Sequence, residues 1–390
     1  MIGREPGAGN EFFAGQWVQG IGQADTEALA YDTIRTYLYD NDYSFSEWAY
    51  NMRLAAQARF GVVDSRTQRV NRAFAAVGLW DGGFVDSSLN SDARLEFANF
   101  TVSGSPRTYV FVRQPGGTNT LMQARYRTCS VWGGGCSWSA PYNLGYAGSG
   151  AGAATHTGQL WVFYRYDLNG TIRMVTLSGS GTWSTPPTIA PSTSTTDHPV
   201  AAVAFGGDLL VFWRNQGSGA RSIQYARRRS TGVWDSVAFS PGGATSEGGP
   251  AVAVLGSLLY LVYVRDDYVR YRTLNTSGVW SAEQTPGQQS GLAFGTPDAH
   301  VYRNRLHVAV PVDDGGTIMP AYMSYCPSGC FYRPGEWTAL VPEHLLWAPT
   351  SSSDVSLFSD SGNPLDGRGE QLYLFRNTSL GPLYEFKASE

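Results

Sequence analysis

The chain has 390 residues, of which 15% are charged, and its formal net charge is −4. This length allows a large core with a second, small domain. The acidic balance argues against nucleic acid, which requires a basic face, and no apolar run is long enough to span a membrane. We therefore expect no nucleic-acid partner and no membrane span.

The first 79 residues predict a small α-helical subdomain. Helices are expected to begin at Asp25, Ser44 and Asp64, because apolar residues at spacings of three and four follow each of them. The second start matches a capping box. Gly61 and Gly78 are expected to end the second and third helices.

Residues 250–283 show a pattern that the rest of the chain repeats. They predict four short strands separated by turns, and the second strand is apolar on both faces, as expected of a strand buried between two layers. The end of this strand recurs with a closing arginine at Arg113, Arg165, Arg214, Arg265 and Arg376. The fourth strand recurs with Trp138, Trp183, Trp234, Trp280 and Trp337.

Four-stranded repeats at intervals of roughly 45–65 residues are typical of a β-propeller. A β-sandwich also has many short strands, but it does not repeat one phrase in the same register. The last repeat lacks a fourth strand, and residues 79–84, which include Trp80, resemble one. We therefore predict a mainly β chain, with a six-bladed β-propeller over residues 80–390. An N-terminal strand closes it by joining the C-terminal blade, so that no sheet edge stays open.

The four cysteines form two pairs that are close in sequence, Cys129 with Cys136 and Cys326 with Cys330. The pairs belong to distant blades and cannot share a metal ion, so we expect two local disulfides and no metal site. Disulfides indicate an oxidising compartment, and we expect an extracellular, secreted protein. The start of the chain has no apolar stretch like that of a signal peptide. We therefore expect either a mature or engineered fragment, or secretion by another route.

The helical segment resembles the C-terminal end of the thermolysin-like zinc metallopeptidases over about 60 residues. The resembling residues are at 20–22, 37–38, 53–58, 60–61 and 70–78. The resemblance implies that a catalytic peptidase domain precedes this segment. The family's zinc motif, His-Glu-x-x-His, needs two histidines four residues apart, and no two of the five histidines have that spacing. We therefore expect no cofactor and no catalytic residue, and proteolysis by this chain alone is not supported.

The five strand-ending arginines are the candidate binding residues. They are expected at the face where the turns after the second strands meet the connections between blades. Guanidinium groups suit carboxylates or sugar hydroxyls, and Tyr164, Tyr166 and Trp213 could stack on sugar rings. The alternative is structural: each arginine holds its blade to the next by binding a carbonyl or an aspartate there.

Two resemblances bear on the ligand. The six-bladed fucose lectins resemble this chain in architecture only. They use an arginine, a glutamate and an aromatic residue per site, and the third strands here offer only Glu385. Sialidases carry an aspartate in their turn motifs that is missing here. A glycosidase needs two carboxylates facing one bond. The acidic pairs at 266–267 and 313–314 are the candidates, and both lie in turns. Calcium binding by either pair is an alternative that the sequence does not decide.

The first hypothesis is therefore a secreted binding module that recognises a glycan or a surface polymer and is attached to a metallopeptidase-type helical end. The alternative is the C-terminal portion of a secreted zinc metalloendopeptidase that lacks its catalytic half. A glycoside hydrolase of sialidase-like type is the second alternative.

Overall fold

The computed structural model describes residues 21–37, 45–61, part of 64–93, and most of 94–387. The gaps after residue 94 are 117–119, 130–135, 185–186, 191–194, 217–220, 288, 290–292, 315–316, 328–334, 339–340, 343–354, 361–370 and 379–380. The chain divides into two compact units, Met1–Val85 with Asp360–Tyr373 and Leu383–Glu390, and Asp86–Ser359 with Leu374–Pro382. The expected domain boundary at residues 79 and 80 stays a prediction. None of the described helices is long and apolar enough to cross a membrane.

Two of the expected helices are present, α1 (Gln23–Tyr37) and α2 (Phe45–Phe60). Gly61 ends α2 as expected: its φ is +95°, and its N–H donates to the carbonyl of Gln57. Leu29 of α1 packs against Met52 in α2. The bounds of the third expected helix lie outside the described residues. The helices thus form a small core of their own.

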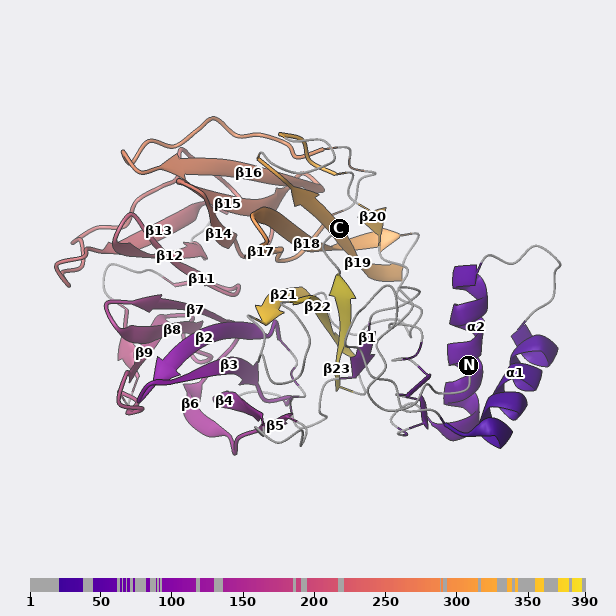
Figure 1. Cartoon of the computed structure of the whole chain (residues 1–390). Helices are drawn as coiled ribbons and strands as arrows, with labels where there is room; N and C mark the ends of the chain where they lie inside the picture. The colour runs from indigo at the N-terminus through magenta and orange to yellow at the C-terminus, as the bar shows by residue number, and fades with distance from the viewer. Residues whose placement is uncertain are drawn as a thin grey trace. The chain divides into compact units, whose positions relative to one another are not determined.

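The described strands form six sheets (Figure 1), which we number in chain order. Sheet 1 contains β2 (Glu96–Val102), β3 (Ser105–Arg113), β4 (Leu121–Cys129), β5 (Cys136–Trp138) and β6 (Tyr142–Tyr146). Sheet 2 contains β7 (Ala151–His156), β8 (Gln159–Arg165), β9 (Ile172–Ser178) and β10 (Thr188–Ile189). Sheet 3 contains β11 (Ala201–Phe205), β12 (Asp208–Arg214) and β13 (Ile223–Arg228).

Sheet 4 contains β14 (Ala251–Leu255), β15 (Leu258–Arg265) and β16 (Tyr268–Asn275). Sheet 5 contains β17 (Asp298–Tyr302), β18 (Arg305–Asp314), β19 (Thr317–Tyr325) and β20 (Val341–Pro342). Sheet 6 contains β21 (Val355–Asp360), β22 (Gln371–Thr378), β23 (Gly381–Lys387) and β1 (Gly82–Phe84). The chain is therefore mainly β, as predicted.

The core lies between successive sheets, because their second strands are buried on both faces. In β8, β12 and β15 every interior position is buried. Phe163 of β8 packs with Val211 of β12, and Phe212 of β12 packs with Tyr263 of β15. A sheet that is apolar on both faces needs a neighbour on each side. This confirms the interpretation of the second strand as a strand between two layers.

The repeated tryptophans join each sheet to the preceding one. Trp183, Trp234, Trp280 and Trp337 each form an isolated bridge with the third strand of their own sheet. Their rings lie near aromatic rings of the preceding sheet: Trp183 is 6.5 Å from Phe111, and Trp234 is 6.2 Å from Phe163. Edge-to-face contacts of this kind stabilise packing beyond the buried area. Trp80 lies outside the described residues.

The first strands follow one another around a common centre. β7 neighbours β2, β11 neighbours β7, β14 neighbours β11, and β17 neighbours β14. Asp298 of β17 accepts the N–H of Leu357 in β21 at 2.7 Å, and Phe358 of β21 stacks on Phe97 of β2 with 4.7 Å between ring centres.

The N-terminal strand pairs with the C-terminal one, as expected: β1 is antiparallel to β23, with Gly83 opposite Tyr384. Because sheet 6 is described only in part, the closed six-bladed propeller stays a prediction.

The pairing of β1 with β23 gives a test of closure. Removing residues 1–85 should leave β23 without its partner and expose a strand edge to other chains. We expect a lower melting temperature and concentration-dependent association, measured by thermal melting and size-exclusion chromatography. Removing residues 1–60 keeps β1 and should have a much smaller effect. A monomeric chain of residues 86–390 with an unchanged melting temperature would contradict the closure.

Candidate functional site

A buried arginine lies where the first strands meet. Arg94 lies two residues before the start of β2, and its side chain is only 2% exposed. Its guanidinium donates to the carbonyls of Ala151 and Val200 at 3.2 Å and of Pro297 at 3.3 Å. These carbonyls belong to the first strands of sheets 2, 3 and 5 or to the residues just before them. A single side chain therefore binds the backbone of three sheets.

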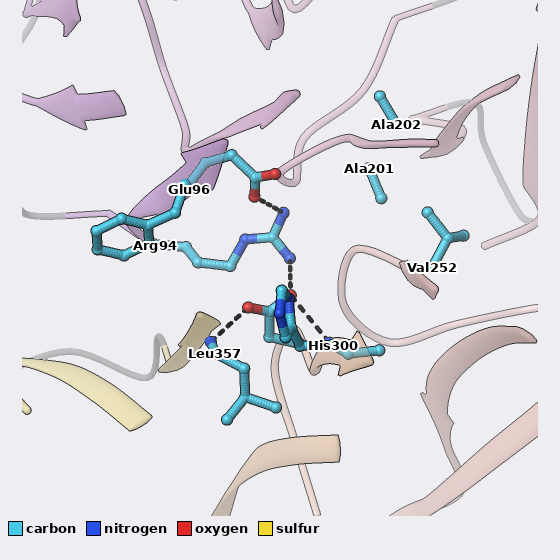
Figure 2. A pocket seen from close by; sticks show the side chains of 10 residues that line it. Arg94, Glu96, Ala201, Ala202, Val252, His300 and Leu357 are labelled. Atoms are coloured by element: carbon cyan, nitrogen blue, oxygen red, sulfur yellow. Dashed lines mark hydrogen bonds and ion pairs between the residues drawn. The ribbon is translucent and has the colours of Figure 1, made fainter. Parts of the chain in front are cut away.

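Two carboxylates flank this guanidinium. Glu96 of β2 lies 3.4 Å from Arg94 (Figure 2). Asp298 of β17 lies 3.5 Å from the same guanidinium. Glu96 also accepts the N–H of Ala153 at 3.1 Å. The ion pairs thus add β2 to the network of Arg94 and give it a second contact with the β17 segment. We call Arg94, Glu96 and Asp298 the axial cluster.

The axial cluster borders a cavity of about 50 Å³. Its lining residues are Arg94, Glu96, Phe97, Ala201, Ala202, Val252, Asp298, Ala299, His300 and Leu357. Pockets for small molecules usually enclose about 300–1,000 Å³, so this cavity suits a few water molecules and excludes a sugar. In the described part of the chain, no three His, Cys, Asp or Glu side chains could hold a metal ion.

Burial controls the charges around this cavity. It raises the pKa of Glu96 and of Asp298, while the guanidinium of Arg94 acts in the opposite direction. Burial also lowers the pKa of His300 to about 4, so its ring is neutral at pH 7. His300 Nε2 lies 2.6 Å from the hydroxyl of Ser359. A glycosidase needs two acids that face one bond of a bound sugar. Here both acids are held by Arg94, and the cavity beside them is too small for a sugar.

Sequence reasoning missed the axial cluster, although a signal was present. First strands elsewhere begin with small or apolar residues, as at 151–154, 201–204 and 251–254. Glu96 and Asp298 each begin a first strand. Acidic residues at positions that face the centre were therefore the available clue.

Three of the strand-ending arginines bind the next sheet. Arg113 Nε donates to the carbonyl of Ala147 at 2.8 Å, and Arg165 Nε donates to that of Thr196 at 2.9 Å. Arg214 donates to the carbonyl of Glu247. Each carbonyl lies in the connection that leads into the first strand of the following sheet. These contacts are those of the structural alternative, and we call the three side chains the latch arginines.

The aromatic residues predicted to stack on sugar rings, Tyr164, Tyr166 and Trp213, do not present free ring faces to solvent. Tyr164 and Trp213 are fully buried, and the hydroxyl of Tyr164 donates to the carbonyl of Leu144 at 2.8 Å. Neither ring therefore offers a free face to a sugar. Tyr166 is half-buried, with the guanidinium carbon of Arg173 4.7 Å from its ring centre.

Arg265 is out of register with the latch arginines. β12 has seven residues and ends at Arg214, whereas β15 has eight and ends at Arg265. Both strands begin at the same point of their hairpins, because Asp208 is opposite Phe205 and Leu258 is opposite Leu255. A shift of one residue moves a side chain to the other face of a strand. The position that corresponds to Arg214 is therefore Val264.

The opposite face gives Arg265 different neighbours. Its Nη2 lies 2.5 Å from Oε1 of Glu283, whose other oxygen accepts the hydroxyl hydrogen of Tyr263 at 2.5 Å. Tyr268 is directly opposite Arg265 in the neighbouring strand, on the same face, and is 40% exposed. The side chain of Arg265 is itself 35% exposed. We call Arg265, Glu283, Tyr263 and Tyr268 the Arg265 site.

Of the Arg265 site, the sequence suggested only the arginine. Tyr268 starts the third strand just after the turn that follows Arg265, but Glu283 follows Trp280 by three residues and is distant from Arg265 in the repeat pattern. Arg376 lies in β22, and its side chain is outside the described residues.

The predicted cysteine pairs are described only in part. Cys129 of β4 is directly opposite Cys136 of β5. Cys326 is buried and disulfide-bonded, and Cys330 lies outside the described residues. The two pairings stay predictions.

Comparison with known proteins shows similarity in structure only. No family model matches the chain, and no curated protein matches it. A variant of the Aleuria aurantia lectin in complex with alpha-methyl-L-fucoside is 16% identical, with a TM-score of 0.50, and covers 76% of this chain and 95% of its own. A further structure of this lectin, described as a six-bladed β-propeller, is 15% identical, with a TM-score of 0.49 and the same coverage.

A GH43_1 enzyme from Xanthomonas citri is 11% identical, with a TM-score of 0.43, and covers 69% of this chain and 97% of its own. The likeness to the lectin supports a β-propeller fold. None of these similarities supports the expected resemblance of the helical segment to thermolysin-like peptidases.

The axial cluster predicts a large loss of stability when its cation is removed. Replacing Arg94 with methionine leaves the buried acids Glu96 and Asp298 without the cation between them, and we expect the free energy of unfolding to fall by about 3–5 kcal/mol. Adding Glu96→Gln and Asp298→Asn should restore part of it. Urea unfolding followed by tryptophan fluorescence measures both.

The matched control is Arg59→Met, which removes an ion pair with Asp32 whose side chains are 39% and 34% exposed. A surface pair of this kind contributes less than about 1 kcal/mol. Equal losses in Arg94→Met and Arg59→Met would show that the axial cluster does not hold the sheets together.

The latch arginines give a second stability test. Arg113→Ala and Arg165→Ala each leave a carbonyl of the next sheet without its donor, and we expect a loss of about 1–3 kcal/mol for each. Melting curves of the two variants measure this loss. Unchanged melting temperatures in both would contradict the structural role.

Proposed function

We propose that the chain is a glycan-binding β-propeller module and that the Arg265 site forms its binding surface. The observation that carries this proposal is a partly exposed Arg265 side chain, held by Glu283, on the same face as the exposed side chain of Tyr268. The guanidinium carbon of Arg270 lies 5.3 Å from the ring centre of Tyr268 and adds a second cation to this surface. A fixed guanidinium with a carboxylate at its side binds neighbouring sugar hydroxyls, because it offers both donors and acceptors. An aromatic ring covers the apolar face of a sugar.

The Arg265 site is preorganised for a ligand. Glu283 is only 14% exposed, and both of its oxygens already accept hydrogen bonds, from Arg265 and from Tyr263. The arginine is therefore held in place before any ligand arrives, which reduces the entropy that binding costs. The latch arginines are also held in place, but their guanidinium groups donate to carbonyls in the connections between sheets.

The structural neighbours support a glycan as the ligand class. The Aleuria aurantia lectin is described as fucose-specific and was solved with a fucoside. The sequence identity is only 14–16%, so we do not assign fucose as the ligand of this chain. We further propose an extracellular location, supported by the expected disulfides. We favour binding over glycoside hydrolysis, because both acids of the axial cavity are paired with Arg94.

A glycan array with the intact chain tests this proposal first. For a glycan that binds, Arg265→Ala should weaken the affinity about 10- to 100-fold, as expected for the loss of hydrogen bonds from a charged donor. Tyr268→Ala should also weaken it, whereas Tyr268→Phe, which keeps the ring, should bind almost normally. Calorimetric titration measures each affinity.

The matched control is Arg165→Ala, which should lower the melting temperature but keep the affinity. An array without any bound glycan would overturn the proposal. Full affinity in Arg265→Ala with a folded protein would move the binding site away from Arg265.

A further inference from the structure

The axial cluster contains more acid than base. Glu96 and Asp298 are 17% and 13% exposed, and both lie within 3.5 Å of the same guanidinium. One arginine neutralises one carboxylate, and a second buried negative charge without a partner is costly. The geometry therefore favours a state in which one of the two acids is protonated.

Hydrogen bonds indicate which acid holds the proton. Asp298 accepts two backbone N–H groups, from Ala299 at 2.9 Å and from Leu357 at 2.7 Å. Glu96 accepts one, from Ala153 at 3.1 Å. Donors stabilise the ionised form of a carboxylate, and the distances to Arg94 are nearly equal. Asp298 is therefore the ionised partner of Arg94, and Glu96 is the neutral one.

The other groups around the cavity do not change this balance. From β17, His300 faces the cavity as a neutral ring, since burial lowers its pKa to about 4. From β11, β14 and β21, the described lining residues are Ala201, Ala202, Val252 and Leu357, which carry no charge. From β7, Glu96 receives the backbone N–H of Ala153. Among the described residues that line the cavity, Arg94 is the single cation.

We propose that Glu96 is a proton-binding site: it holds one proton in the folded protein at neutral pH and releases it on unfolding. The stability of the packed sheets is then coupled to pH through the centre of the fold. Burial, which raises the pKa of Glu96, agrees with this assignment.

The sign of the coupling follows from linkage. The ordinary pKa of glutamate is about 4.3, and that of Glu96 in the folded protein is raised above it. Between the two values the folded state binds more protons than the unfolded one. The stabilisation is complete below the ordinary pKa and is lost as the pH rises through the folded pKa. In this window the folding constant should fall about tenfold per pH unit from this group alone.

The test compares the full-length chain with Glu96→Gln, which mimics the protonated acid. Urea unfolding from about pH 5.5 to pH 8.5, followed by tryptophan fluorescence, gives the folding constant of each protein. We expect the ratio of the folding constant of the variant to that of the wild type to rise as the pH rises. The histidines are the same in both proteins, so their contributions cancel.

The control variant is Glu27→Gln, an exposed residue of α1, which should leave the pH dependence unchanged. Asp298→Asn should weaken the fold at every pH, because it removes the counter-charge of Arg94 and one acceptor of a backbone N–H. A ratio for Glu96→Gln that does not change with pH would overturn the proposal. The proposal would also be overturned if the ratio of folding constants, variant to wild type, rose with pH for Asp298→Asn and not for Glu96→Gln.

A second measurement needs no variant. Calorimetric unfolding of the wild type at about pH 7.5, in buffers with different ionisation enthalpies, counts the protons released. Groups that gain protons on unfolding can only reduce the number released, so net release at this pH comes from an acid that is protonated in the folded state, and we expect it from Glu96. Release of no proton would overturn the proposal, even if Glu96→Gln fails to fold.

Discussion

The structure depends on one constraint: the second strand of each repeat is apolar on both faces and must be covered on both. In β8, for example, Phe163 packs toward sheet 3, whereas Val162 packs toward sheet 1. The sheets therefore stabilise one another in sequence, and no single sheet would be stable alone. The tryptophans and the latch arginines strengthen this arrangement at two places, through ring contacts and through hydrogen bonds to the next connection.

The arginines at the strand ends show how one residue of strand length changes a role. Arg214 closes a strand of seven residues and binds the carbonyl of Glu247 in the next connection. Arg265 closes a strand of eight, so its side chain leaves the opposite face and meets Glu283. A latch needs a guanidinium that donates to a fixed acceptor of the next sheet, whereas a binding site needs donors that remain accessible. The register of the strand decides between the two.

The centre of the fold combines stability with a charge imbalance. Arg94 binds carbonyls of three sheets and two carboxylates, and the cavity beside it is too small for a sugar. A buried ion network is a weak source of net stability, but removing one member is costly, because the others are left buried and unpaired. The axial cluster therefore fixes how the first strands pack together, and it makes the stability of that packing depend on the protonation of an acid.

Local patterns in the sequence were enough to predict a mainly β chain, the presence of α1 and α2, and the double-sided burial of the second strands. These features follow from local spacing of apolar residues, which acts over a few positions. Glu96 with Asp298, and Arg265 with Glu283, could not be paired from the sequence. Their contacts join residues that are distant along the chain or shifted by one position between repeats. The packing of successive sheets brings Arg94 to Asp298, and the register of β15 within sheet 4 brings Arg265 to Glu283. The tertiary structure alone therefore decided the charges at the axial cluster and the neighbours of Arg265.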